Sequence, residues 1–289
     1  MKKFLYALFS FTVLFSSCQD EIQLELTDPV PQVVIDGCIT TKDTVHYVRI
    51  SSTQNYLSSE KPDFTNEKDA VVNLYEDGNL ATQYQFNDST KQFESTFRAT
   101  IGKTYVLEVQ LADGTTYLSE EERTRRVPSI DTLWVEKSTS GFTQGNYDII
   151  FTSREPAGVG DNYQWKLYYN GEYQNQPFDL LFAEDRLVDG NVIGELPLAS
   201  IDEEKYDELV KSTGKDTIRI VLDQTTITRN YYEFLLIVQQ QTAFIGGPFD
   251  SPPAPIRGNI YRSEDFDNRA LGFFYAASVE TAFTKYRPE

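Results

Sequence analysis

The chain has little of what most metalloenzymes and hydrolases depend on. Its 289 residues include two cysteines and one histidine, and the formal net charge is −18. One histidine cannot supply a zinc site built from two or three imidazoles, and no Gly-x-Ser-x-Gly segment offers it a nucleophile. The acidic charge argues against nucleic acid as a partner. We therefore expect no enzyme activity, no metal site and no cofactor.

Long apolar runs are also scarce, and the clearest one lies at the N-terminus. Lys2 and Lys3 precede an apolar stretch over residues 4–15, and Ser16-Ser17-Cys18 follows it. This order is typical of a secretory signal peptide, and the stretch is shorter than the roughly 20 residues that span a bilayer. Cys18 after two serines resembles the lipobox of bacterial lipoproteins. We predict a signal peptide over residues 1–17 and a lipid anchor on Cys18.

The residues after Cys18 indicate where the anchored chain lies. Gln19, Asp20 and Glu21 resemble the acidic tract that directs lipoproteins of Bacteroides-type bacteria to the cell surface. Residues 18–31 are acidic and contain two prolines, as expected of a tether that holds a folded part away from the membrane. We therefore expect an outer-membrane location, on the outer face.

Acylation of Cys18 would leave Cys38 as the other cysteine of the chain, so no intramolecular disulfide is expected. Cys38 belongs to the strand-like run Val33-Val34-Ile35-Asp36-Gly37-Cys38-Ile39. We expect it to be a small buried apolar side chain rather than a reactive thiol.

The first half of the mature chain reads as a series of short strands. Alternating segments separated by turn residues lie at 33–39, 45–50, 70–75, 80–86, 92–97, 104–111 and 115–118. This spacing predicts an immunoglobulin-like or prealbumin-like β-sandwich over residues 32–126. The lone histidine, His46, is expected to be a partly exposed strand residue.

The second half, residues 127–289, is expected to be β-rich with two helices. Strand-like runs lie at 130–136, 147–152, 163–169, 217–222 and 271–278. Ser200 with Glu203 resembles a capping box for a helix that ends at Gly214, and Thr228 is a cap for a second helix. Tyr163, Trp165 and Leu167 share the core face of one strand.

Several segments resemble an outer-membrane lipoprotein family of Bacteroides-type bacteria known as domain of unknown function 4249. The segments are Val33-Val34-Ile35-Asp36-Gly37-Cys38-Ile39-Thr40, Tyr105-Val106-Leu107-Glu108-Val109, Asp113-Gly114-Thr115-Thr116-Tyr117, Asn230-Tyr231-Tyr232-Glu233-Phe234, Gly247-Pro248-Phe249, Ile256-Arg257-Gly258-Asn259-Ile260 and Ala270-Leu271-Gly272-Phe273-Phe274. The resemblance covers nearly the whole mature chain. It implies an association with TonB-dependent outer-membrane transporters and carries no catalytic residues.

Two groups of residues are candidates for contact with a partner. The loop over residues 246–255 is stiffened by prolines, and its candidates are Pro248, Phe249, Pro252 and Pro253. Tyr169 and Tyr173 are the aromatic residues expected to reach solvent. The alternative for the loop is a rigid crossover that covers the core.

Carboxylates suggest no site of their own. Asp202, Glu203, Glu204, Asp207 and Glu208 crowd one predicted helix and are expected to face water. The acidic segment around Asp265 and Asp267 lacks the glycine and the terminal glutamate of an EF-hand loop. The sequence therefore predicts a surface lipoprotein that acts as a non-enzymatic accessory partner of a TonB-dependent transporter. The alternative is an adhesin that binds glycans or matrix.

Overall fold

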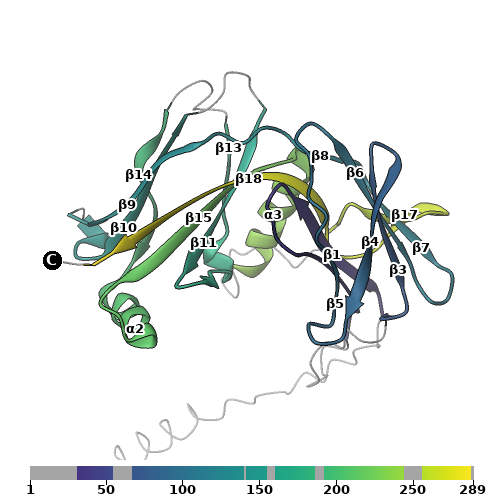
Figure 1. Cartoon of the computed structure of the whole chain (residues 1–289), viewed down its shortest axis with the longest axis horizontal. Helices are drawn as coiled ribbons and strands as arrows, with labels where there is room; N and C mark the ends of the chain where they lie inside the picture. Colours follow the sequence, from purple (N-terminus) through teal and green to yellow (C-terminus); the bar gives the residue numbers. More distant parts are fainter. Residues whose placement is uncertain are drawn as a thin grey trace, which may run out of the picture.

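The computed structural model describes residues 31–54, 67–139, 141–154, 160–185, 192–243 and 256–287. It is mainly β with two α-helices, which confirms the expected fold class (Figure 1). The strands of the first half are β1 (Val33–Thr40), β2 (His46–Ser52), β3 (Val71–Glu76), β4 (Asn79–Asn87), β5 (Gln92–Ser95), β6 (Thr104–Gln110), β7 (Thr116–Ser119) and β8 (Glu122–Arg123).

Within the described ranges, the second half adds ten strands and two helices. The strands are β9 (Ile130–Lys137), β10 (Tyr147–Arg154), β11 (Asn162–Tyr169), β12 (Glu172–Tyr173), β13 (Leu181–Glu184), β14 (Val192–Ile201), β15 (Ile218–Ile227), β16 (Ile260–Arg262), β17 (Asp265–Arg269) and β18 (Phe274–Tyr286). The helices are α2 (Glu203–Thr213) and α3 (Arg229–Thr242), and two 3-10 turns lie at Gly141–Thr143 and Pro177–Asp179.

The first half is a sandwich of two layers, and strand β4 takes part in both of them. β1, β2, β5 and the end of β4 form one layer, and β3, β6, β7 and the start of β4 form the other. Alternation places Val72 and Leu74 of β3 and Tyr105, Leu107 and Val109 of β6 in a core between the layers. β1 to β7 lie within a residue or two of the predicted strands, and β8 was not predicted.

The second half packs a three-stranded sheet, β14-β10-β9, against the sheet that contains β11, β15 and β18. The core between the two sheets includes Ile149, Tyr163, Leu167 and Leu222. The predicted inward face of the strand at 163–169 is therefore confirmed. β16 and β17 return to the first half, where β16 pairs with β7. Where the chain divides into domains stays a prediction.

β18 joins the two halves, because it pairs with a strand of each. Its first residues pair in parallel with β1, and its remaining residues pair antiparallel with β15. In Figure 1 this yellow strand runs from the first half across to the far side of the second. One hydrogen-bonded sheet path therefore continues from β11 through β15, β18 and β1 to β2.

Both predicted helices are present, and one of their caps differs from the prediction. Thr228 caps α3 by accepting a hydrogen bond from the Tyr231 backbone, as expected. The capping box at Ser200 is wrong, because Ser200 still belongs to β14 and its hydroxyl donates to Asp148. Asp202 caps α2 instead, and Gly214 ends it with φ +62°. No helix in the described ranges is long and apolar enough to cross a membrane.

Two glycine-bearing segments of the family resemblance, residues 256–260 and 270–274, meet at the start of β18. A Cβ on Gly272 would lie 2.2 Å from the Ile35 carbonyl oxygen, and Gly272 has φ +88°. Asn259 fixes the same point, since its side chain donates to the Phe274 carbonyl at 2.7 Å and accepts from the Phe274 amide at 3.0 Å. These residues hold β18 against β1, so their pattern is structural.

Candidate functional site

A cleft of about 420 Å³ lies between the two halves, on the sheet face opposite the core of the second half. Alternation produces this face: β11 buries Trp165 and Leu167 and turns Lys166 and Tyr168 into the cleft. The same face continues across β15, β18, β1 and β2. The remaining lining residues are Cys38, Thr40, Lys42, Thr44, Val45, His46, Tyr47, Tyr173, Asp223, Thr225, Tyr275 and Val279.

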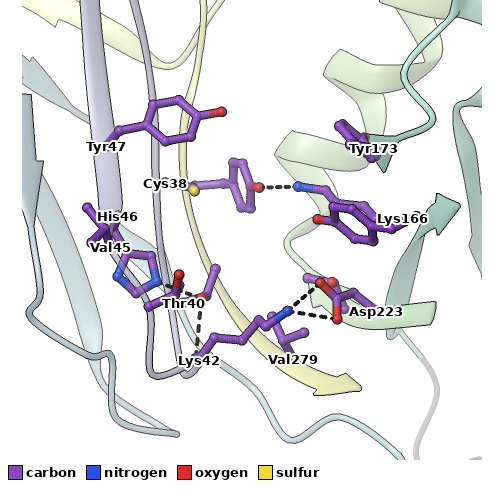
Figure 2. Close-up of a pocket in the computed structure, with 14 residues that line it drawn as sticks. Cys38, Thr40, Lys42, Val45, His46, Tyr47, Lys166, Tyr173, Asp223 and Val279 are labelled. Atoms are coloured by element: carbon purple, nitrogen blue, oxygen red, sulfur yellow. Dashed lines mark hydrogen bonds and ion pairs between the residues drawn. The ribbon is translucent and has the colours of Figure 1, made fainter. Parts of the chain in front are cut away.

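Each wall of the cleft carries an accessible tyrosine. Tyr47 of β2 is 38% exposed and extends its hydroxyl into the space, while Tyr173 of β12 is 36% exposed on the opposite wall (Figure 2). Tyr173 leans on the Tyr168 ring at a centroid distance of 5.2 Å. The cleft therefore has one ring supplied by each half of the molecule.

Lys166 lies between the walls, surrounded by aromatic groups. Its ammonium donates to the Tyr275 hydroxyl at 2.7 Å and lies 5.2 Å from the Tyr275 ring centroid and 5.8 Å from that of Tyr173. Tyr275 is itself held by α3, because the Tyr231 ring stacks on it at 4.1 Å. Cation–π contacts and the hydroxyl acceptor thus hold a positive charge in the cleft.

The second lysine of the cleft is neutralised by an ion pair between the two halves. Lys42, just after β1, donates to both carboxylate oxygens of Asp223 on β15, at 2.9 and 2.7 Å. Thr281 of β18 donates to the same carboxylate at 2.6 Å. The Asp223 side chain is 5% exposed, so its oxygens are shielded and engaged. Asp223 is also the one carboxylate among the described residues that line the cleft.

His46 forms part of the framework of the cleft. It is 2% exposed, so the expected partial exposure is wrong. One ring nitrogen, Nδ1, lies 3.0 Å from the Phe97 carbonyl and acts as the donor, and Nε2 accepts from the Thr40 hydroxyl at 2.7 Å. Burial lowers the pKa of His46, and the Phe97 contact opposes that shift less strongly. A neutral imidazole with both nitrogens occupied joins β1, β2 and the segment after β5.

Tyr47, Tyr173 and Cys38 keep their protons at neutral pH. Burial raises the pKa of Tyr47 to about 12 and that of Tyr173 to about 12. Burial also raises the pKa of the Cys38 thiol. Cys38 is partly rather than fully buried, with its side chain against the cluster around α3. The cleft therefore offers neutral hydroxyls, aromatic faces and ammonium groups.

Of the two tyrosines predicted to contact a partner, the structure places one in the cleft and buries the other. Tyr173 lies in the cleft, whereas the expectation that Tyr169 reaches solvent is wrong, because Tyr169 is 4% exposed. The alternation that buries Tyr163 and Trp165 simply continues to Tyr169. Outside the described residues lie Cys18, Gln19, Asp20, Glu21, Pro248, Phe249, Pro252 and Pro253.

Sequence reasoning missed Tyr47, Lys166 and Asp223. The sequence could have identified Lys166. The odd-numbered residues of the strand at 163–169 face the core, so its even-numbered residues must point to the opposite face of the sheet. The carboxylates predicted on the first helix do face water, and no group of three or more potential metal ligands occurs within the described ranges.

The fold and the cleft define a mainly β protein whose two halves share one strand and enclose an aromatic, lysine-bearing cleft. The family is settled by sequence: the model described as "Domain of unknown function (DUF4249)" matches residues 19–282, and the chain belongs to this family. Curated proteins give no match. A solved structure titled "Crystal structure of protein from Archaeoglobus fulgidus" aligns at 10% identity and a TM-score of 0.21, covering 56% of this chain and 98% of that one. A score this low adds nothing to the description of the fold.

Proposed function

We propose that this protein is a non-enzymatic binding protein, anchored to the outer membrane by Cys18 and exposed on the cell surface. In this role it is an accessory partner of a TonB-dependent transporter. The observation that carries the binding role is the cleft itself, in which the accessible side chains of Tyr47 and Tyr173 lie on opposite walls and Lys166 lies between these walls (Figure 2). Its volume lies within the range of small-molecule sites, about 300–1,000 Å³.

The chemistry of the cleft favours binding over catalysis. The cleft holds one histidine, and both of its ring nitrogens are occupied. Its carboxylate, Asp223, is engaged by Lys42 and Thr281. General acid–base catalysis needs a titratable group free to exchange a proton with a substrate, and nucleophilic catalysis needs an activated nucleophile. Cys38 is a poor nucleophile because burial raises its pKa.

The membrane part of the proposal rests on the N-terminal sequence. A basic start, a short apolar stretch and Ser16-Ser17-Cys18 support export and acylation, and Gln19-Asp20-Glu21 supports surface exposure. More than one acyl chain gives stable anchoring where a single chain does not. The transporter association follows from the family resemblance.

The test is isolation of the tagged full chain from outer membranes in mild detergent. We expect a TonB-dependent barrel to copurify with the wild-type protein, and we expect Cys18→Ser to leave the chain unacylated and outside the membrane fraction. Recovery of the acylated protein without any barrel would overturn the accessory role.

A second candidate function is that of an adhesin that binds glycans or matrix. It is favoured by the two accessible tyrosine rings, because aromatic faces are common at sugar-binding and protein-binding surfaces. A glycan array probed with the full chain distinguishes the two. Glycan binding without a barrel partner favours the adhesin.

A further inference from the structure

We propose that the cleft binds an acidic saccharide, with a sugar ring held between Tyr47 and Tyr173 and its carboxylate on Lys166. The inference rests on the proposed role of the cleft as a ligand site and names the class of ligand. Three features of the cleft carry it: an accessible tyrosine on each wall, a net positive charge and a lining rich in hydroxyls.

The two tyrosines can contact one ligand from opposite walls of the cleft. Tyr47 and Tyr173 come from different halves of the chain, and each leaves more than a third of its surface accessible. Their positions are fixed from behind, since the Tyr168 ring packs on Tyr173 and the Arg49 guanidinium lies 5.5 Å from the Tyr47 ring centroid. Rings held in this way lose little entropy when a ligand binds between them.

The charge of the cleft is opposite to that of the whole protein. The chain has a net charge of −18, yet two lysines and one carboxylate line the cleft. Asp223 directs both oxygens to Lys42. Asp36, on the same face of β1, lies opposite Arg49 in the register with β2. Burial raises the pKa of Asp36, and the charges of Arg49 and then Lys166 oppose that rise. Among the described residues, Lys166 forms no ion pair.

Lys166 is therefore the cation available to a ligand. An ammonium has three N–H donors, and the Tyr275 hydroxyl, a neutral acceptor, takes one of them. A carboxylate would supply a charge-assisted hydrogen bond, roughly twice as strong as a neutral one. The cation–π contacts of Lys166 with Tyr173 and Tyr275 keep its ammonium beside the space between the tyrosine rings.

The remaining lining distinguishes a saccharide from a peptide. Hydroxyls come from Tyr47, Tyr168, Thr40, Thr44 and Thr225. Among the lining residues that the structure describes, the aliphatic side chains are two valines, Val45 and Val279. Recognition of a peptide end uses apolar pockets for side chains next to the carboxylate. A surface of hydroxyls and aromatic faces suits the alternating hydroxyl edges and C–H faces of a sugar ring.

The test is isothermal titration calorimetry of the full chain in detergent with three uronic acid trisaccharides: galacturonate, glucuronate and mannuronate. The neutral trisaccharide of the same linkage is the control ligand for each. We expect at least one uronate to bind and its neutral counterpart to bind at least about tenfold more weakly, as expected for loss of a hydrogen bond to a charged group.

The variants locate the ligand. Lys166→Met, which keeps the aliphatic stem, should lower affinity for the uronate about tenfold and leave affinity for the neutral sugar unchanged. Tyr47→Ala and Tyr173→Ala should weaken both ligands several-fold, because each removes one stacking face. Lys91→Met, on an exposed lysine of the first half, is the matched control and should change neither. Thermal unfolding of every variant checks that it folds.

Three results would overturn the inference. They are binding by none of the uronates, equal affinity for charged and neutral sugars, and unchanged uronate affinity in folded Lys166→Met. Binding of a peptide with a free carboxyl terminus in place of the uronates would replace saccharide by peptide as the ligand class. Each result is separate from the copurification experiment, since a barrel partner can be recovered whether or not the cleft binds sugar.

Discussion

Glu122 provides the sharpest test of how the two halves are joined. It is 0% exposed and lies where β8, α3 and β18 meet. Its carboxylate accepts from the Thr228 hydroxyl at 2.8 Å and from the Asn259 amide at 3.2 Å. Burial nevertheless dominates and raises the pKa of Glu122 to about 8, against these hydrogen bonds, which lower it.

A raised pKa makes the folded protein lose stability as pH rises. Between the ordinary carboxyl pKa and about 8, folded Glu122 holds a proton that the unfolded chain has lost. Each pH unit in that window therefore costs the folded state about 1.4 kcal/mol, or on the order of 4 kcal/mol from pH 5 to pH 8. Glu122→Gln has a similar shape and cannot ionise, so it should not suffer this loss.

The assay is urea unfolding of wild type and Glu122→Gln, followed by circular dichroism from pH 5 to pH 9. The free energy of unfolding of the variant, minus that of wild type, should rise by about 4 kcal/mol between pH 5 and pH 8. Glu121→Gln, at an exposed neighbour, is the control and should show no such rise. A difference that stays flat or falls with pH would contradict a protonated Glu122 in the folded protein. It would mean that Thr228, Asn259 and the N-terminus of α3 keep the carboxylate ionised in the folded protein.

Three further predictions concern the framework around the cleft. Lys42→Met should lower the free energy of unfolding by about 3 kcal/mol in urea titrations, because it leaves the shielded Asp223 carboxylate without its cation. Lys103→Met, which removes an exposed ion pair, should lower it by less than about 1 kcal/mol. Equal losses in the two variants would contradict this prediction. Burial lowers the pKa of His46, so as the pH falls this histidine is protonated in the unfolded chain before it is protonated in the folded protein. The free energy of unfolding should therefore fall as the pH drops below about 6.5. His46→Gln should remove that acid-side slope in the same titrations, and an unchanged slope would count against the assignment. Gly272→Ala should lower the melting temperature far more than Gly78→Ala. Both glycines have positive φ, so both variants bear the backbone cost. A Cβ at Gly272 would also collide with the Ile35 carbonyl, whereas nothing lies within 4 Å of a Cβ at Gly78. Similar melting temperatures for the two variants would show that this close contact is not rigid.

Local patterns were enough to predict most strands and both helices. Alternation over residues 163–169 identified the buried face of β11, and Thr228 was correctly read as the cap of α3. Two of the wrong predictions arose locally, one because the alternation along a strand was ended too early and one because a nearby residue was taken as the helix cap. Tyr169 continues the buried face of β11, and Asp202 replaces Ser200 as a cap because β14 extends through Ser200.

The cleft could not be predicted in the same way, because it depends on pairings between distant parts of the chain. Cys38 lies beside Tyr275 only because β1 pairs in parallel with β18, and Lys42 reaches Asp223 only because β18 also pairs with β15. The glycines that allow this arrangement were visible in the sequence as a family pattern. Their role became clear from backbone contacts such as that between Gly272 and Ile35.

A crystal structure of the full chain with the tightest-binding uronic acid trisaccharide tests most directly whether a ligand binds between Tyr47 and Tyr173, beside Lys166. We expect a sugar ring between the two tyrosines, with a carboxylate oxygen about 2.7–2.9 Å from Lys166 Nζ. A saccharide bound elsewhere on the protein, with the cleft empty, would contradict it.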